Sequence, residues 1–334
     1  MTQIGLIGCG MWGRNLARNL ASLGVLAAVA DRNEERATAF ATEFNTDATT
    51  VDDLITTASL DGIVIATAAP THCDLAVRAL SAGRHVYIEK PLALTLSDAQ
   101  QIGAAATRAG RQVMVGHLIR YHDAFRELQS LVASGAIGRV RHVTANRLAM
   151  GRIRATESVL FDLCPHDLSL ILALMGDQPL DVSCHGASHV TPGIVDTLST
   201  FLAFPGGRSA SLNSSWISPY KEHRLVVSGS QGALVFDDTM PWDAKLTLYR
   251  DSISADGDNF AIDRAAPETI PVAESEPLKQ EMQAFTACCA SGKPAPSDIE
   301  EALGVQRVLE QMQSILMDHG MIARADISPH AERA

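Results

Sequence analysis

Short apolar runs alternate with segments of helical spacing along the first third of the chain. The apolar runs cover residues 3–8, 25–31, 61–68, 85–91 and 112–117. Between them, apolar residues recur every three or four positions, as with Leu16, Leu20 and Leu23. Strands that alternate with helices predict a parallel sheet covered on both faces. We therefore expect residues 1–117 to form a doubly wound α/β domain of the Rossmann type.

The pattern changes after residue 117. Helical spacing occurs at 121–135 and 165–176, and two more helices are expected near 276–291 and 298–318. The strand-like alternating segments cover 180–190, 196–204, 208–217, 223–230, 232–238 and 245–250. This order predicts that residues 118–334 form an α+β domain with a large open, mostly antiparallel sheet. The polar stretch 251–277 is expected to be a long surface loop.

Composition narrows the class of protein. The chain has 334 residues and a formal net charge of −11, a field that repels nucleic acid and anionic membranes. It has no apolar run long enough to cross a membrane and no basic leader, so a cytoplasmic protein is expected. The six cysteines form no C-x-x-C pair. We therefore expect reduced thiols, with no disulfide framework and no metal site.

A glycine motif follows the first apolar run. Gly8, Gly10 and Gly13 form G-x-G-x-x-G between a strand and a helix, with Met11 and Trp12 inside the motif. Such glycines permit a tight turn, a close approach of a pyrophosphate and close packing of helix on strand. The motif predicts dinucleotide binding at the helix N-terminus; the alternative is a glycine turn that only packs against the helix.

Two further segments are expected to contact the cofactor. Asp31 ends the second apolar run, where an acid binds the adenosine ribose, so NAD is favoured over NADP. Arg32 complicates that choice because a guanidinium can bind a 2′-phosphate. Thr67, Pro70 and His72 follow the third run, at an edge where ligands collect. His72 could instead cap the next helix.

The fourth apolar run ends in Glu89, Lys90 and Pro91. An acid and a base at the carboxyl end of a buried strand face the ligand crevice, which makes them candidate site residues. The alternative is a surface salt bridge. Together with G-x-G-x-x-G, "ATAAPTH" and a later D-x-x-x-H, this E-K-P tripeptide resembles the Gfo/Idh/MocA oxidoreductases, NAD(P)-dependent dehydrogenases and reductases of sugars, cyclitols and sugar nucleotides. The resemblance implies that Lys90 is catalytic, that Glu89 and Lys90 contact the cofactor, and that the lysine–proline bond is cis.

The D-x-x-x-H pattern falls on Asp162 and His166. Residues four apart share a helix face, and histidine titrates near neutral pH, as an acid–base catalyst should. The resemblance implies that His166 exchanges the substrate proton and that Asp162 binds substrate or assists. Many relatives carry an acid at the position of Ser169, so one substrate contact is in doubt. A helix-capping histidine is the alternative.

Basic residues near this helix hint at an anionic substrate. The expected substrate-binding residues are His117, Arg120, Arg147, Arg152, Arg154, Asp162 and His166. A solvated strand edge would explain the arginines equally well. Two segments, 8–24 and 116–143, resemble the family branch that oxidises the 3-hydroxyl of UDP-activated amino sugars.

These features predict an NAD-dependent dehydrogenase that transfers hydride from a secondary alcohol to nicotinamide. The expected substrate is UDP-N-acetylglucosamine, whose 3-keto product a partner transaminase would aminate. Inositol or free-sugar oxidation is the enzymatic alternative, and a non-catalytic NAD(H) redox sensor is the alternative of another class. Which of Lys90 and His166 accepts the proton stays open. Relatives pair their open sheets between subunits, which implies a homodimer or homotetramer.

Overall fold

The computed structural model describes residues 2–151, 153–155, 157–257 and 259–322. They fall into two compact units. Of the described residues, the first comprises those up to Tyr121 together with Glu276–Arg307, and the second comprises those of His122–Ser275 and those from Val308 to Ile322. The sequence analysis divided the chain at residue 117 and placed 276–307 in the second domain. The structure instead packs that segment in the first unit, because apolar side chains of 278–285 cover one face of the first sheet and those of 299–303 cover the other.

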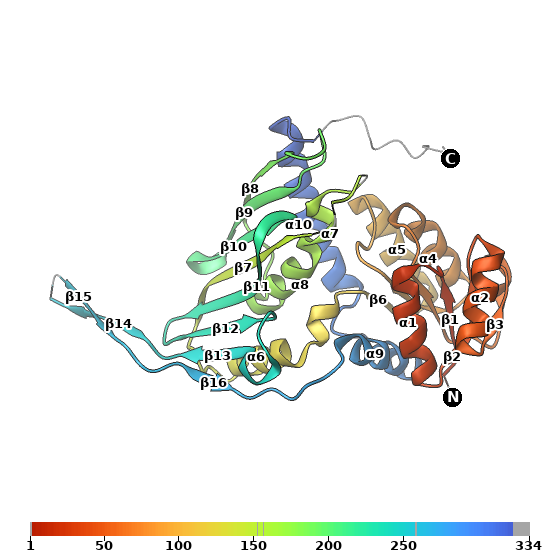
Figure 1. Ribbon diagram of the computed structural model, residues 1–334, viewed down its shortest axis with the longest axis horizontal. Helices are drawn as coiled ribbons and strands as arrows, with labels where there is room; N and C mark the ends of the chain where they lie inside the picture. The colour runs from red at the N-terminus through yellow and green to blue at the C-terminus, as the bar shows by residue number, and fades with distance from the viewer. Residues whose placement is uncertain (1, 152, 156, 258, 323–334) are drawn as a thin grey trace. The chain divides into compact units, whose positions relative to one another are not determined.

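Six parallel strands form the sheet in the described part of the first unit (Figure 1). They are β1 (Ile4–Ile7), β2 (Leu26–Ala30), β3 (Asp47–Ala48), β4 (Gly62–Ile65), β5 (His85–Ile88) and β6 (Val113–Val115). Their order is β3-β2-β1-β4-β5-β6. The chain runs outward to β3 on one side of β1 and returns to β4 on the other. This reversal creates a crevice at the carboxyl ends of β1 and β4, where doubly wound sheets bind ligands.

Helices cover both faces of this sheet. They are α1 (Met11–Ser22), α2 (Glu34–Phe44), α3 (Val51–Thr56), α4 (His72–Ser81), α5 (Leu96–Ala109), α9 (Pro277–Ser291) and the first part of α10 (Ile299–Asp318), with the 3-10 turns η1 (Ala69–Thr71) and η2 (Leu118–Tyr121). One core joins α4, α5 and α10 to the sheet, and the other joins α1, α2 and α9 to it. Figure 1 shows α9 beside α1. All β1 side chains are buried between the two layers, as the uninterrupted apolar run predicts.

The second unit contains a sheet of eight described strands in the order β16-β13-β12-β11-β7-β10-β9-β8. Their bounds are β7 (Val140–Met150), β8 (Asp181–Ala187), β9 (Thr197–Phe204), β10 (Arg208–Ser215), β11 (Ile217–Gly229), β12 (Ala233–Asp237), β13 (Leu246–Tyr249) and β16 (Glu268–Ile270). β7 and β10 pair in parallel, and the other neighbours pair antiparallel. The predicted fold class, a Rossmann domain followed by an α+β domain, is confirmed.

One face of this sheet packs on helices, and the other carries exposed polar side chains together with Phe201. The helices are α6 (Asp123–Ala133), α7 (Val159–Asp162) and α8 (Cys164–Met175), with the short turns η3 (Pro205–Gly207) and η4 (Trp242–Ala244). Along β9, Leu198, Leu202 and Phe204 are buried, whereas Ser199 and Phe201 are exposed. This alternation with a period of two is typical of an antiparallel sheet with one wet face.

Two parts of the second unit differ from the prediction. The sequence analysis assigned no strand to 140–150, yet β7 lies in the middle of the sheet between β10 and β11. The expected loop 251–277 instead contains the hairpin β14 (Ser252–Asp256) and β15 (Asn259–Asp263), and then β16. Figure 1 shows the hairpin extending away from β13 and β16. β14 alternates polar and apolar residues, but β15 has Phe260, Ala261 and Ile262 in succession. The described side chains of the hairpin are exposed, and the polar composition of the whole stretch suggested a loop.

Within the described ranges, no helix combines the length and the apolar content that crossing a bilayer requires.

Candidate active site

The glycine motif forms the turn from β1 into α1, and its three glycines have different roles. Gly8 has a φ of +107°, and a Cβ there would lie 2.5 Å from the Ala66 carbonyl oxygen. A Cβ on Gly13 would lie 2.0 Å from the carbonyl oxygen of Gly8. These two positions therefore need glycine for packing. A Cβ on Gly10 would meet no atom within 4 Å, so its glycine instead keeps the backbone open to an incoming group.

The start of α1 is suited to an anion. Gly10 is its N-cap and supplies no capping side chain, so the first N–H groups receive no capping bond from that residue. Met11 and Trp12, which the sequence placed with the cofactor, form the first helical turn and are exposed. Backbone N–H groups and the helix dipole together favour phosphate at this point.

Asp31 stands at the end of β2, directly behind the glycine loop. Its Oδ2 accepts the backbone N–H of Cys9 at 2.8 Å, and its Oδ1 accepts the N–H of Asn33 at 2.9 Å. Nη1 of Arg36 lies 3.7 Å from the same carboxylate. These contacts fix the carboxylate at the crevice, and each oxygen retains a lone pair for a ribose hydroxyl. Burial and the neighbouring Asp31 raise the pKa of the Cys9 thiol to about 12, so that thiol is neutral.

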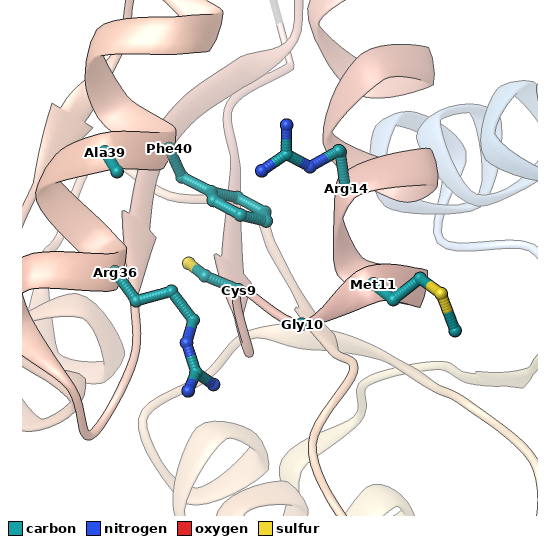
Figure 2. A pocket seen from close by; sticks show the side chains of 7 residues that line it. All are labelled: Cys9, Gly10, Met11, Arg14, Arg36, Ala39 and Phe40. Atoms are coloured by element: carbon teal, nitrogen blue, oxygen red, sulfur yellow. The ribbon is translucent and has the colours of Figure 1, made fainter.

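Two cavities border this loop. One, of about 530 Å³, is lined by Cys9, Gly10, Met11, Arg14, Arg36, Ala39 and Phe40 (Figure 2). The Arg14 guanidinium lies 5.1 Å from the centre of the Phe40 ring on its wall. The other, of about 560 Å³, lies toward β4 and is lined by Ile7, Gly8, Gly10, Asp31, Arg32, Arg36, Val51, Ala66, Thr67, Ala68, Pro70, Thr71, Asp74 and Leu75. The structure thus brings together the glycine loop, Asp31, Arg32, Thr67 and Pro70, as predicted for a dinucleotide site.

His72 occupies a different position from its neighbours in sequence. It is the first residue of α4 and only 1% exposed. Its Nδ1 lies 2.9 Å from the carbonyl oxygen of Pro91, and its Nε2 lies 3.1 Å from that of Thr67. Burial lowers the pKa of the imidazole, although the two carbonyl groups oppose this. The ring therefore ties the β4–α4 loop to the chain after β5, and its predicted contact with the cofactor stays a prediction.

The E-K-P segment lies at the carboxyl end of β5. The Lys90–Pro91 peptide bond is cis, as the resemblance implied. Glu89 is 8% exposed and accepts hydrogen bonds from the hydroxyl of Tyr87, at 2.9 Å, and from the side chain of Trp12. Burial raises the pKa of Glu89, against these donors and the charge of Lys90. Glu89 is thus a buried, bonded carboxyl, and the alternative of a surface salt bridge does not describe it.

His117 and Arg120 are joined by an acid that the sequence analysis did not select. Nδ1 of His117 lies 2.7 Å from one carboxylate oxygen of Glu301, and Nη1 of Arg120 lies 3.8 Å from the other. All three lie in the first unit, and His117 is 2% exposed. Their predicted contact with substrate stays a prediction.

In the second unit, Asp162 and His166 lie on either side of the junction between α7 and α8. Asp162 ends α7 and is buried. Its Oδ1 accepts a hydrogen bond from Nη2 of Arg154 at 2.8 Å, and its Oδ2 accepts one from the indole N–H of Trp216 at 3.1 Å. His166 lies in the first turn of α8 and is half-buried. The expected helical start at this motif is therefore present, and Trp216 orients the acid.

The arginines chosen as substrate ligands have internal partners. Arg147 is buried and donates from Nε and Nη2 to the two oxygens of Asp167, each at 2.7 Å. This bidentate pair fastens α8 to β7 and neutralises the charge within the fold. Arg154 is more exposed and also contacts Glu157 at 3.3 Å. Arg152 lies outside the described residues.

The sequence analysis missed several residues that shape these sites. They are Arg36, Tyr87, Trp216, Glu281 and Glu301. Arg36, at the cofactor cavity, could have been inferred from its place in the first turn of the helix after Asp31. Tyr87 lies two residues before Glu89, so the alternation of side chains along a strand could have placed it beside that acid. Trp216, Glu281 and Glu301 meet their partners through long-range packing, which no local pattern predicts.

Two comparisons with known families match most of the chain. Residues 2–117 match the family described as "Oxidoreductase family, NAD-binding Rossmann fold", and residues 125–235 match "GFO/IDH/MocA C-terminal domain".

Individual relatives agree with these matches. UDP-N-acetylglucosamine 3-dehydrogenase of Acidithiobacillus ferrooxidans is 30% identical and covers 89% of this chain and 91% of its own length. A solved structure of that enzyme superposes with a TM-score of 0.83 at 28% identity, covering 94% of this chain and 96% of that one. Inositol 2-dehydrogenase of Rhizobium meliloti is 28% identical and covers 72% of this chain and 76% of its own length.

Proposed function

We propose, from the premise that this chain belongs to the Gfo/Idh/MocA family of NAD-binding oxidoreductases, that its substrate is the secondary alcohol of a sugar nucleotide. The preferred substrate in this proposal is UDP-N-acetylglucosamine, oxidised at its 3-hydroxyl. The similarity to UDP-N-acetylglucosamine 3-dehydrogenase along nearly the whole chain is the observation that carries it. The chain itself is an NAD-dependent oxidoreductase that acts on CH–OH groups.

The residues of the first unit fit NAD. The open backbone at Gly10 and the start of α1 suit a pyrophosphate, and the fixed carboxylate of Asp31 suits the adenosine ribose. Gly10 and Asp31 line the cavity of about 560 Å³. Arg32 and Arg36 lie in the wall of that cavity, and their guanidinium groups suit stacking on adenine. NAD, when bound, supplies the hydride acceptor.

The chain's own residues handle the proton and the developing charge. Lys90, at the carboxyl end of β5, stabilises the alkoxide that develops as the substrate hydroxyl loses its proton, and departure of hydride from the carbinol carbon then converts that alkoxide to the ketone. His166 takes the hydroxyl proton, and Asp162, held by Trp216 and Arg154, orients the substrate beside it. The balance is one alcohol oxidised to a ketone, one hydride to the cofactor and one proton to the protein. An exchange of the proton-accepting role between Lys90 and His166 is the alternative within this mechanism.

Two partners belong to the proposal. A 3-keto sugar nucleotide is a ready substrate for amination, so a transaminase is the proposed consumer of the product. The outer face of the second sheet, where Asn213 bonds both Ser199 and Asn146 and Phe201 is exposed, is the proposed surface of a homo-oligomer. Size-exclusion chromatography with light scattering tests the oligomer, and a monomer at micromolar concentration would contradict it.

The substrate is tested by following NADH formation with UDP-N-acetylglucosamine, myo-inositol and a panel of free sugars. We expect the highest kcat/KM with the UDP sugar. Turnover of inositol or a free sugar alone would favour the alternative supported by the inositol 2-dehydrogenase relative. Lys90→Met and His166→Asn should each lower kcat by about 100-fold or more while NADH binding remains. NADH binding without turnover of any substrate would instead indicate a redox sensor.

A further inference from the structure

Three polar side chains are buried in contact beneath the E-K-P segment. Tyr87 and Glu281 are fully buried, and Glu89 is 8% exposed. The Tyr87 hydroxyl lies 2.9 Å from Oε1 of Glu89 and 3.2 Å from Oε2 of Glu281. Tyr87 and Glu89 come from the end of β5, and Glu281 comes from α9 across the apolar core of the same unit. We call these three residues the acid–phenol–acid chain.

The number of protons available excludes a state of the acid–phenol–acid chain in which both glutamates are ionised. The phenol has one proton and can donate it to only one of the two acids. If both acids were ionised, one would face a phenol oxygen lone pair and a like charge in a dry interior. One acid must therefore carry a proton and donate it to the tyrosine oxygen.

The surroundings identify which acid that is. Glu89 receives bonds from Tyr87 and Trp12 and lies beside the positive charge of Lys90. In the described part of the chain, the ionisable groups that interact with Glu281 are Glu89, Tyr87 and Tyr121, whose hydroxyl bonds Ser297, and none of these three is a cation. Among described residues, Oε1 of Glu281 has no hydrogen-bond partner. Burial, and then the charge of Glu89, raise the pKa of Glu281 well above its usual range.

We propose that Glu281 is a neutral acid that donates to Tyr87, that Tyr87 donates to Glu89, and that this directional chain holds Glu89 as the anion beside Lys90. Tyr87 and Glu281 are then positioning residues for the lysine. The proposal rests on the catalytic role given to Lys90 under "Proposed function". Close packing supports a fixed chain: a Cβ on Gly116 would lie 2.7 Å from the Tyr87 hydroxyl and 2.9 Å from Oε2 of Glu89. Because Gly116 has no side chain, the Tyr87 hydroxyl and the Glu89 carboxyl fit beside its backbone, and this close contact fixes their positions.

Infrared spectroscopy of the cofactor-free protein tests the protonation directly. We expect the carbonyl stretch of a protonated carboxyl group to persist in the wild type at neutral pH, above the range in which ordinary acids are protonated. Glu281→Gln should remove this band, whereas Glu89→Gln should leave it. A wild type without the band at neutral pH overturns the proposal even if no variant folds. Loss of the band in Glu89→Gln, with retention in Glu281→Gln, overturns the assignment to Glu281.

The positioning role has a separate readout. Tyr87→Phe removes a donor from Glu89 and raises the pKa of that acid further, so the acidic limb of the kcat profile should move to higher pH by about one unit. The limb for Glu281→Gln should stay within a few tenths of a unit of the wild type, because an amide can also donate to the tyrosine oxygen. Tyr121→Phe is the matched control, since it removes a buried phenol hydroxyl outside the chain. Equal profiles for Tyr87→Phe and Tyr121→Phe would contradict the positioning role. Failure to find a turned-over sugar would leave the infrared result intact, so the two proposals fail separately.

Discussion

The two units of this chain build their candidate site residues in opposite ways. In the first, backbone geometry makes the site: Gly8 and Gly13 are required for packing, and Gly10 leaves open space. In the second, side chains make it by pairing with one another, as in Arg147 with Asp167 and Arg154 with Asp162. A backbone site can be recognised from a short motif. Clustered charges in a sequence reveal neither their partners nor which of them face a ligand.

The buried pair in the second unit offers the largest test of this contrast. Arg147→Met should lower the free energy of unfolding by about 3–5 kcal/mol, because it leaves the Asp167 carboxylate buried without its partner. The double variant Arg147→Met/Asp167→Leu should recover most of that loss. Chemical denaturation measures both. A single variant as stable as the wild type would mean that Arg147 is free to serve a ligand, as the sequence analysis expected.

The glycine loop gives the next largest effect, and it should separate stability from binding. Gly13→Ala places a Cβ 2.0 Å from the Gly8 carbonyl oxygen and should cost about 2–3 kcal/mol in unfolding free energy. Gly10→Ala meets no atom and should change stability by less than about 0.5 kcal/mol. We nevertheless expect Gly10→Ala to weaken NADH binding by at least about tenfold, because its methyl group projects toward the pyrophosphate. Thermal denaturation measures the effect on stability, and NADH fluorescence titration measures the effect on binding. Unchanged NADH binding in Gly10→Ala would contradict the placement of the pyrophosphate at this loop.

The smallest effect concerns His72. It lies in the first unit, but, like Arg147 and Arg154 in the second unit, its side chain is held by partners within the fold. Its folded-state pKa is lowered by burial, so the unfolded chain binds a proton that the folded chain does not. Its contribution to stability is therefore intact above about pH 6.5 and is lost as pH falls below that value, by up to about 1.4 kcal/mol per pH unit. In His72→Gln, the free energy of unfolding should depend less steeply on pH below about pH 6.5, by an amount that corresponds to about one bound proton. Denaturation at pH 7.5, 6.5 and 5.5 measures it, with His142→Gln as the half-buried control. An identical slope in His72→Gln and the wild type would contradict a neutral buried imidazole.

Sequence by itself determined the parts that depend on local geometry. Apolar runs that alternate with segments of helical spacing predict a Rossmann-type domain, because strands that are apolar along their whole length occur mostly in parallel sheets covered by helices on both faces. The glycine motif, Asp31 and E-K-P could be placed because each follows a strand directly, and parallel strands end at one edge. The family could be named from G-x-G-x-x-G, "ATAAPTH", E-K-P and the later D-x-x-x-H, and the family comparisons confirm it.

Only the tertiary structure decided which polar groups are partners. Glu281 meets Tyr87 across 194 residues of sequence, and Glu301 meets His117 across 184. The strand β7 lies inside the sheet between β11 and β10 although charged residues interrupt its alternation, because Val143 and Ala145 are buried on the face where α8 packs. Such pairings depend on the packing of distant elements, and the energy of a buried charge is set by whatever group that packing brings beside it.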